Sequence, residues 1–544
     1  MKLNKVIAIS VLNLVIGSAY AQPADTVFIN GKIITVDDKG AIHQALAVRQ
    51  GRIVAVGKTN SIKKWIGSQT DVLDLKGKSV IPGLIDSHMH GIRAALSYST
   101  EVHWFGLSTI DAALDKVKQA ASRAKPGEWL IVAGGWTEEQ FKEGRRPTQA
   151  ELLQAAPNNP IYVQWMYEWV MLTPLAYQAL NIQNEADLPA GGKFIRDEAG
   201  KPTGAIAGGV VPLFDKLPKP SFEQKVIGTT KFFNELNRVG VTGIIDPGGF
   251  NMSPTEYAPL FQVWKNKQLT VRVNYSYFAQ KKDKEFEEFK ELTQLLPMGF
   301  GDHMLRFNGI GERVTFSMYN NDKATPNDQE KFYQVARWAA QNGLTLTQHW
   351  QENASADSLL QVLEKVNQEF PIAKLRWSIA HLNNGTASTF ERMKALGVGW
   401  AMQDAMYLDG DKTLHKHGEK VLERMPPINT ALKMGLHIGA GTDAHRVADY
   451  NPFIALRWML DGKSASGKKL RGTEEIPTRL QALQMYTLGS AWLAHDEANR
   501  GSLEVGKWAD IAVLTDDYLT VPLDQIGRIH STLTMVGGKI VHRD

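Results

Sequence analysis

Eight short apolar runs, each ending in a polar residue, constrain the fold of this chain more than any other feature. The runs are VIPGLIDSHMH (80–90), GVTGIID (240–246), LTVRVNYSYF (269–278), LRFNGIGERV (305–314), LTLTQHW (344–350), LRWSIAHL (375–382), VGWAMQ (398–403) and HIGAGTDA (437–444). After the second run, successive starts are 23–39 residues apart, which fits a strand followed by a crossover helix. Eight such units predict an α/β protein built on a TIM barrel.

The gap between the first two runs is too long for a single helix. Residues of about 100–220 are therefore expected to form a large insertion after the first barrel strand. Within it, WLIVAGGW (129–136) and IYVQWMYEW (161–169) are apolar segments that belong to the insertion itself. With this insertion included, we expect the barrel to span residues 81–495.

Both ends of the chain alternate β-type runs with glycine-containing turns. Asn30-Gly31 and Gln50-Gly51 each separate two such runs, as hairpin turns do. The same alternation of β-type runs and glycine-containing turns is found again after residue 500. We therefore expect one small β-sandwich assembled from residues 22–80 and 496–544.

Residues 1–21 have the pattern of a cleaved secretory signal peptide. Two lysines precede the apolar run at 6–17, and Ala19-Tyr20-Ala21 is a small-x-small cleavage pattern. A membrane anchor is the alternative, but about 12 apolar residues are well short of the roughly 20 that span a bilayer. We expect a secreted protein without a stable membrane anchor, located in a bacterial periplasm.

The amino-acid composition limits the kinds of catalytic site and the kinds of binding partner that this chain can have. The chain has no cysteine, which excludes disulfides, a thiolate zinc site, Fe–S clusters and a cysteine nucleophile. Any metal must be held by histidine and carboxylate. The net charge is only +4 and no long basic run is present, so no nucleic-acid partner is expected. A small molecule is the expected ligand.

Histidines and carboxylates stand at the ends of the predicted strands, where TIM barrels build their active sites. These strand-end residues are His88, His90, Asp246, Glu312, His349, His381, Gln403 and Asp443. His88 and His90 are two apart on a strand, so both side chains point to one face and suit a single metal ion. Each residue taken alone has an ordinary structural explanation, but together they predict a metal site. The donors suit Zn²⁺, and also Fe, Mn, Co or Ni.

At these positions the chain resembles the amidohydrolase superfamily. The motifs that carry the resemblance are PGLIDSHMH (82–90), QHW (348–350), AHL (380–382) and GTDA (441–444). A finer resemblance is to the amidohydrolase-3 group, which includes the N-substituted formamide deformylases. It rests on GGW (134–136), RRPTQAELLQAAP (145–157), GVTGIIDPG (240–248) and RGSLEVGKWADIAVL (500–514). The resemblance covers nearly the whole mature chain and does not specify a substrate.

The resemblance implies roles for the strand-end residues. His88, His90 and Asp443 would bind the more buried metal ion. His349 and His381 would bind a second ion or, in members with one metal, help to hold the first or contact the substrate. One ion or two therefore stays open.

The fourth strand departs from the family pattern. Many members bridge two metals with a carboxylated lysine from this strand, but GIGERV (309–314) has no lysine. Glu312 is the candidate for the bridge, because a carboxylate can also span two cations. The alternative is an ion pair between Glu312 and Arg313 or another basic group.

The insertion departs from the pattern too. Related members often carry Asp-Gly-His where this chain reads MYEWVML (166–172), and Trp169 stands near that histidine position. Trp136 and Trp169, with Trp165 and Tyr167, are candidates for the wall of an aromatic substrate pocket. The alternative is that they pack the insertion's own core. Asp246 and Gln403, at two strand ends, are further pocket candidates.

The implied function is hydrolysis of a non-peptide C–N bond in an amide, formamide or cyclic amide. It would proceed through a metal-bound hydroxide, with Asp443 as general base and then general acid. His381 would stabilise the oxyanion if it is not a full ligand. Ester, lactone or phosphoester hydrolysis and deamination are alternatives on the same site, and so is a non-catalytic exported binding or regulatory protein. The resemblance also allows a homodimer.

Overall fold

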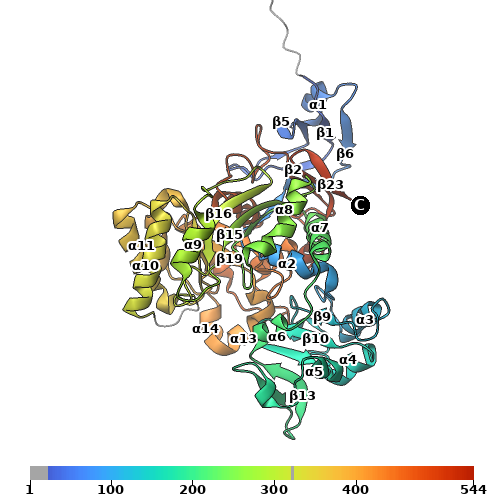
Figure 1. Ribbon diagram of the computed structural model, residues 1–544. Helices are drawn as coiled ribbons and strands as arrows, with labels where there is room; N and C mark the ends of the chain where they lie inside the picture. Colours follow the sequence, from blue (N-terminus) through green and yellow to red (C-terminus); the bar gives the residue numbers. More distant parts are fainter. Residues whose placement is uncertain (1–21, 320–323) are drawn as a thin grey trace, which may run out of the picture.

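The computed structural model describes residues 22–319 and 324–544, and its centre is an eight-stranded parallel barrel (Figure 1). The predicted signal peptide lies outside the described residues. The barrel strands, in chain order and in spatial order, are β8 (Leu84–Asp86), β14 (Val241–Asp246), β15 (Arg272–Tyr277), β16 (Leu305–Glu312), β17 (Leu346–Trp350), β18 (Ser378–His381), β19 (Gly399–Gln403) and β20 (Ile438–Gly441). All eight predicted runs supply a strand, and the predicted TIM-barrel class is confirmed.

Backbone hydrogen bonds close the barrel between its first and last strands. The Ser87 N–H donates to the Ala440 carbonyl at 3.0 Å, and the Asp443 N–H donates to the His88 carbonyl at 2.8 Å. Burial on both faces explains why the strands are continuously apolar rather than alternating. In β14, for example, all six residues are buried.

Helices follow the strands and cover the outside of the barrel. They are α2 (Gly91–Ser97), α7 (Phe222–Arg238), α8 (Ala258–Lys265), α9 (Glu285–Thr293), α10 (Pro326–Gln341), α11 (Ala356–Glu369), α12 (Ala387–Leu396), α13 (Met406–His417), α14 (Glu419–Leu422), α15 (Ile428–Lys433), α16 (Pro452–Asp461), α17 (Arg479–Gln484) and α18 (Ser490–Leu493). Local sequence sets their ends. Helix α7 begins with a capping box between Ser221 and Gln224, and Gly240, in the left-handed region, follows it.

The insertion between α2 and α7 forms its own mixed sheet, in the order β12-β13-β11-β10-β9. Its strands are β9 (Leu130–Val132), β10 (Ile161–Trp165), β11 (Trp169–Leu172), β12 (Lys193–Arg196) and β13 (Pro202–Ala207). Its helices are α3 (Ile110–Ala121), α4 (Gln149–Ala155), α5 (Pro174–Ala179) and α6 (Val210–Asp215). In Figure 1 this unit, in cyan and green, lies at the end of the molecule opposite the described amino terminus.

The two ends of the described chain build a pair of β-sheets together. One sheet has the order β5-β4-β1-β6, and the other has the order β23-β22-β21-β7-β2-β3. The strands are β1 (Thr26–Ile29), β2 (Lys32–Ile34), β3 (Ile42–His43), β4 (Ala45–Arg49), β5 (Arg52–Gly57), β6 (Asp71–Asp74), β7 (Ser79–Pro82), β21 (Ile511–Leu514), β22 (Ser531–Val536) and β23 (Lys539–Arg543). Phe28, Val80 and Ile511 belong to one buried cluster, so residues from both ends share a core. A short helix, α1 (Thr59–Ile62), packs beside the first sheet.

One of the two predicted hairpin turns is correct and the other is wrong. Gln50 and Gly51 have φ angles of 50° and 75° and join the antiparallel strands β4 and β5, as a two-residue hairpin requires. Asn30-Gly31 instead carries the chain from one sheet to the other. Asn30 has a φ of 56°, but Gly31 is outside the left-handed region, so the turn cannot be of the primed hairpin type.

The run 80–90, predicted as one strand, is divided at Gly83. Strand β7 belongs to the sandwich and β8 to the barrel, so the chain passes between the two units at this glycine. A Cβ here would lie 2.2 Å from Cγ2 of Thr242, which leaves no room for a side chain. Among the described residues, no helix is long and apolar enough to cross a bilayer.

A buried ion pair joins the barrel to the sandwich. The guanidinium of Arg272, at the start of β15, donates to both oxygens of Asp510 at 2.7 and 2.8 Å. The N–H of Gly537 donates to the same carboxylate at 2.7 Å. Burial would raise the pKa of Asp510, but Arg272 outweighs it and holds that pKa below its usual range.

We expect Asp510→Asn to lower the free energy of unfolding by about 3–5 kcal/mol at pH 7, because it leaves a buried guanidinium without its counter-charge. The lowered pKa means that this stabilisation is present above the unfolded-state pKa of about 4 and is lost as pH falls through the folded-state value. Urea unfolding followed by circular dichroism should therefore show that the difference in free energy of unfolding between wild type and variant becomes smaller as the pH is lowered. The exposed Asp524→Asn is the control, and an equal effect there would contradict the assignment.

Candidate metal centre

Six predicted side chains meet at the carboxyl ends of the barrel strands, and all are buried. They are His88, His90, Glu312, His349, His381 and Asp443. They come from strands β16, β17 and β18 and from the segments directly after β8 and β20. Residues 355 positions apart in the chain are thus brought together by closure of the barrel.

Glu312 lies in the middle of this group. Its Oε2 is 3.3 Å from Nε2 of His88, 3.1 Å from Nδ1 of His349 and 3.4 Å from Nε2 of His381, and its Oε1 is 3.5 Å from Nε2 of His90. Burial would raise the pKa of Glu312, but the imidazoles of His349 and His88 outweigh burial and hold that pKa well below its usual range. The carboxylate is therefore ionised and faces both histidine pairs.

Asp443 faces the first histidine pair from the other side. Its Oδ1 lies 3.2 Å from Nε2 of His90 and 3.7 Å from Nε2 of His88. Burial would raise the pKa of Asp443, but the hydrogen bond to His90 and the nearby imidazoles lower it overall. Asp443 therefore also provides an ionised oxygen at this point.

The donor set fits divalent cations. Three overlapping groups of three ligand atoms each lie within 4.8 Å of one another: His88, His90 and Glu312; His88, His381 and Asp443; and Glu312, His349 and His381. Nε2 of His88 and Nε2 of His381 are buried and have no hydrogen-bond partner among the described residues. A buried polar atom without a partner is costly, and a bound cation would satisfy both nitrogens. Because Glu312 belongs to two of the groups, a carboxylate bridge between two ions is compatible with the arrangement.

The alternative for Glu312 is an ion pair with Arg313 or another basic group, and its Arg313 form is wrong. Among the described residues, the basic groups within ion-pair distance of Glu312 are the four imidazoles of the centre. Nε and Nη2 of Arg313 donate to the carbonyl of Ala279 at 2.9 and 2.6 Å. The guanidinium carbon lies 3.8 Å from the ring centre of Phe316 and 4.4 Å from that of Phe278. Within the described part of the chain no carboxylate pairs with Arg313, which points away from the metal centre into an aromatic cluster.

Asp246, predicted to line the substrate pocket, instead fixes the backbone that holds the ring of His90 in place. Its two oxygens accept the N–H groups of Gly248 at 2.8 Å and Ile92 at 2.7 Å. The Gly248 carbonyl in turn accepts Nδ1–H of His90 at 2.5 Å, which leaves Nε2 free to bind metal. Burial raises the pKa of Asp246 to about 6.

Gln403, the other pocket candidate from a strand end, supports His381 in the same way. Its Oε1 accepts the His381 N–H at 2.8 Å, and its Nε2 donates to the Ala401 carbonyl at 2.5 Å. Gln403 is buried, and its amide is bonded to the neighbouring strand β18 at one end and to its own strand β19 at the other, rather than to a ligand.

Asp86 is a supporting residue that the strand-end prediction missed. Its carboxylate accepts the N–H of His88 at 3.0 Å and the hydroxyl of Thr442 at 2.7 Å, next to Asp443. It thereby connects the two ends of the barrel sheet directly behind the metal ligands. Burial raises the pKa of Asp86 to about 7. Its place two residues before His88 in the PGLIDSHMH motif is the signal that identifies it.

Trp136 and Trp169 lie in the insertion's own core, which is the alternative that the sequence left open. Trp136 is fully buried, its ring centre is 5.9 Å from that of Trp169, and its indole donates to the Gln164 carbonyl at 2.8 Å. Trp165 belongs to the same cluster. Tyr167 differs, because it lines a cavity between the insertion and the barrel.

An α/β barrel with buried imidazoles and carboxylates at the carboxyl ends of its strands defines a class of metal-dependent barrel enzymes. A family model described as the amidohydrolase family matches residues 71–542. The chain belongs to this family, and it is a metal-dependent amidohydrolase.

Individual relatives match along nearly the whole chain. Protein LONG AFTER FAR-RED 3 of Arabidopsis thaliana is 26% identical over 95% of this chain and 91% of its own length. The N-substituted formamide deformylase of Arthrobacter pascens is 24% identical over 95% of this chain and 98% of its own. An uncharacterised metal-dependent hydrolase from Pyrococcus horikoshii shares the fold, with a TM-score of 0.66, 20% identity, and coverage of 92% of this chain and 99% of the other.

We expect Glu312→Gln to weaken zinc binding by at least about tenfold, because it removes the charge shared by two ligand groups. The measurement is bound zinc by mass spectrometry after dialysis against a competing chelator. Glu330→Gln, on the exposed side of α10, removes the same charge away from the centre and should bind zinc as wild type does. Unchanged zinc in a folded Glu312→Gln protein would contradict the role of this carboxylate.

Proposed function

We propose that this amidohydrolase cleaves a non-peptide C–N bond of a small molecule, in an amide, formamide or cyclic amide. The observation that carries the proposal is the central position of Glu312 between His88 and His90 on one side and His349 and His381 on the other. The name of the Arthrobacter pascens relative, which acts on N-substituted formamides, supports the choice of bond.

Zinc is the proposed cation, because the site offers only imidazole and carboxylate donors; Fe, Mn, Co and Ni accept the same donors. His88, His90 and Asp443 would hold one ion, His349 and His381 a second, and Glu312 would bridge them. Such cations lower the pKa of water and polarise a carbonyl oxygen.

Asp443 is the proposed proton carrier. It is ionised, buried and next to the histidine pair, so it can accept a proton from the attacking water and then donate it to the departing nitrogen. Overall, water adds across the C–N bond, which yields a carboxylic acid and an amine. His381 stabilises the developing oxyanion in this proposal if its Nε2 is not fully committed as a ligand.

Export is a separate part of the proposal and rests on the amino-terminal sequence. The lysines, the apolar run and the Ala19-Tyr20-Ala21 pattern support cleavage after residue 21 and release into the periplasm. Mass spectrometry of the protein recovered from a periplasmic extract would test this, since the mature chain would begin at Gln22.

We expect Asp443→Asn to lower kcat by about 100- to 10,000-fold, because it removes the proton carrier while keeping the side-chain shape. Wild type and variant, both loaded with zinc, would be compared on N-substituted formamides, N-acyl amines, cyclic amides and esters. The matched control is the exposed Asp524→Asn. A near-wild-type rate in a folded Asp443→Asn protein would refute the assignment, and turnover of esters alone would refute the proposed bond.

A further inference from the structure

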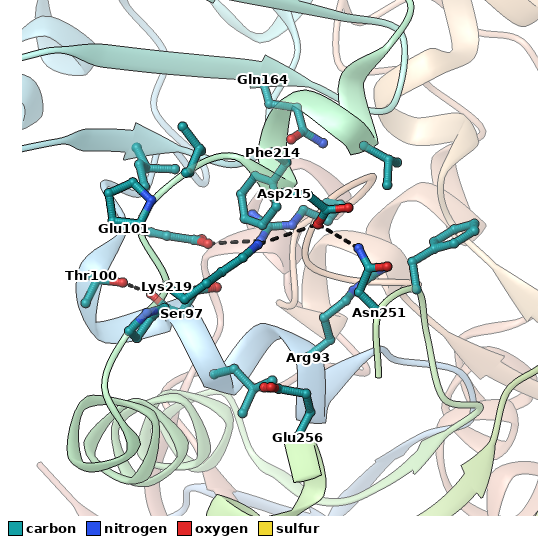
Figure 2. Close-up of a pocket in the computed structure, with 18 of the residues that line it drawn as sticks. Arg93, Ser97, Thr100, Glu101, Gln164, Phe214, Asp215, Lys219, Asn251 and Glu256 are labelled. Atoms are coloured by element: carbon teal, nitrogen blue, oxygen red, sulfur yellow. Dashed lines mark hydrogen bonds and ion pairs between the residues drawn. The ribbon is translucent and has the colours of Figure 1, made fainter. Parts of the chain in front are cut away.

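A cavity of about 390 Å³ lies beside the metal centre, between α2, the loop after β14 and the insertion (Figure 2). None of the six residues of the metal centre lines it. Much of its wall is apolar, with contributions from Leu96, Ile131, Leu217, Phe214, Phe250 and Met252. Its volume is within the range of small-molecule sites, and it suits a large apolar group.

The carboxylates that line this cavity already have partners. The pairs are Glu101 with Arg446 at 3.0 Å, Asp215 with Asn251 at 2.7 Å and Lys219 at 3.5 Å, and Glu256 with Lys225 at 2.6 Å. Figure 2 shows the bonds around Asp215 as dashed lines. These pairs also satisfy every cationic side chain on the wall except one.

Arg93 is that exception. Among the described residues, no carboxylate lies within ion-pair distance of it, and its Nε is buried without a hydrogen-bond partner. Its guanidinium is hydrogen-bonded to the side chain of Tyr167, whose ring centre is 6.0 Å from the guanidinium carbon. The carboxylates of Asp443 and Asp246 raise the pKa of Arg93 from farther away. Asp443, however, belongs to the metal centre, and Asp246 is hydrogen-bonded to backbone N–H groups. A partly buried guanidinium without a carboxylate partner is available to bind an anion.

Arg93 also lies close to His90, one of the residues of the metal centre. It follows His90 by three residues, which is about one turn of α2. A Cβ placed on Gly249 would be 3.4 Å from Nδ1 of His90 and 3.6 Å from Nε of Arg93, so both side chains lie against the same glycine. A group bound by the guanidinium would therefore lie near His90 and next to the apolar wall.

We propose that Arg93 binds a carboxylate of the substrate, next to the scissile amide, while a large apolar group of the same molecule fills the cavity. The substrate class is then the N-acylated derivatives of apolar amino acids. The planar guanidinium fork matches a carboxylate in two parallel hydrogen bonds. This inference rests on the proposed amide hydrolysis and adds the substrate class.

The test compares ligands that differ only in this charge. Binding of 3-phenylpropionate and of neutral 3-phenylpropanamide to the zinc-loaded protein would be measured by titration calorimetry. We expect wild type to prefer the carboxylate, and Arg93→Gln to weaken carboxylate binding about 10- to 100-fold while leaving the amide unchanged. Arg337→Gln removes a partly exposed arginine of α10 that is paired with Glu369, and it should change neither affinity. Equal losses for both probes, or none, would overturn the proposal.

Turnover separates this inference from the proposed function. The substrates would be both enantiomers of N-acetylphenylalanine and the neutral counterpart N-acetylphenethylamine. A fall in kcat/KM of Arg93→Gln confined to the carboxylate substrates supports the proposal, and equal falls on both would mean that Arg93 serves the reaction itself. If the wild type cleaves no amide at all, the proposed function fails, and the calorimetry still decides whether Arg93 binds a carboxylate. Should Arg93→Gln not fold, Arg93→Lys keeps the charge and must keep the preference.

Discussion

Closure of the barrel between its first and last strands is the constraint on which the functional site depends. His88 and His90 follow β8 and Asp443 follows β20, so these ligands meet only when the two strands pair. Asp86 strengthens the pairing of β8 with β20, because its carboxylate accepts the backbone N–H of His88 on one side and the hydroxyl of Thr442 on the other. The contacts that close the barrel therefore also hold the metal ligands in place. If β8 and β20 were paired less tightly, the ligand atoms would lie too far apart to share a metal ion.

Conformational strain accompanies this arrangement. His381 and Asp443 have φ angles of 69° and 60°, in the left-handed region that residues other than glycine rarely occupy. Each such position costs about 1–3 kcal/mol and persists only where the surroundings impose it. Here Gln403 holds the backbone of His381, and the His88 carbonyl holds that of Asp443. Both strained residues provide donor atoms, so the strain directs ligands into the centre.

The sequence predicted the barrel well and its surroundings less well, for physical reasons. Parallel strands buried on both faces leave continuous apolar runs, and their carboxyl ends must converge, so both the strands and the six clustered side chains were recognisable. A polar residue at a strand end does not reveal which way it faces, and for this reason Asp246 and Gln403 were misassigned to the pocket. Arg93 follows His90 on a helix, and no sequence motif identifies it as a functional residue. Its significance depends on which carboxylates are already paired, which only the three-dimensional structure shows.

The sandwich shared by the two chain ends has a consequence for biosynthesis. Strand β7 pairs with β2 on one side and with β21 on the other, and β21 lies more than 400 residues further along the chain. Until the ribosome has delivered that last segment, β7 keeps an open hydrogen-bonding edge and the apolar face of the first sheet stays uncovered. Such edges and faces attract other chains, so the interval before completion is the period of greatest aggregation risk. A nascent chain of this architecture is therefore less exposed to aggregation when this edge and this face are shielded until its final residues emerge.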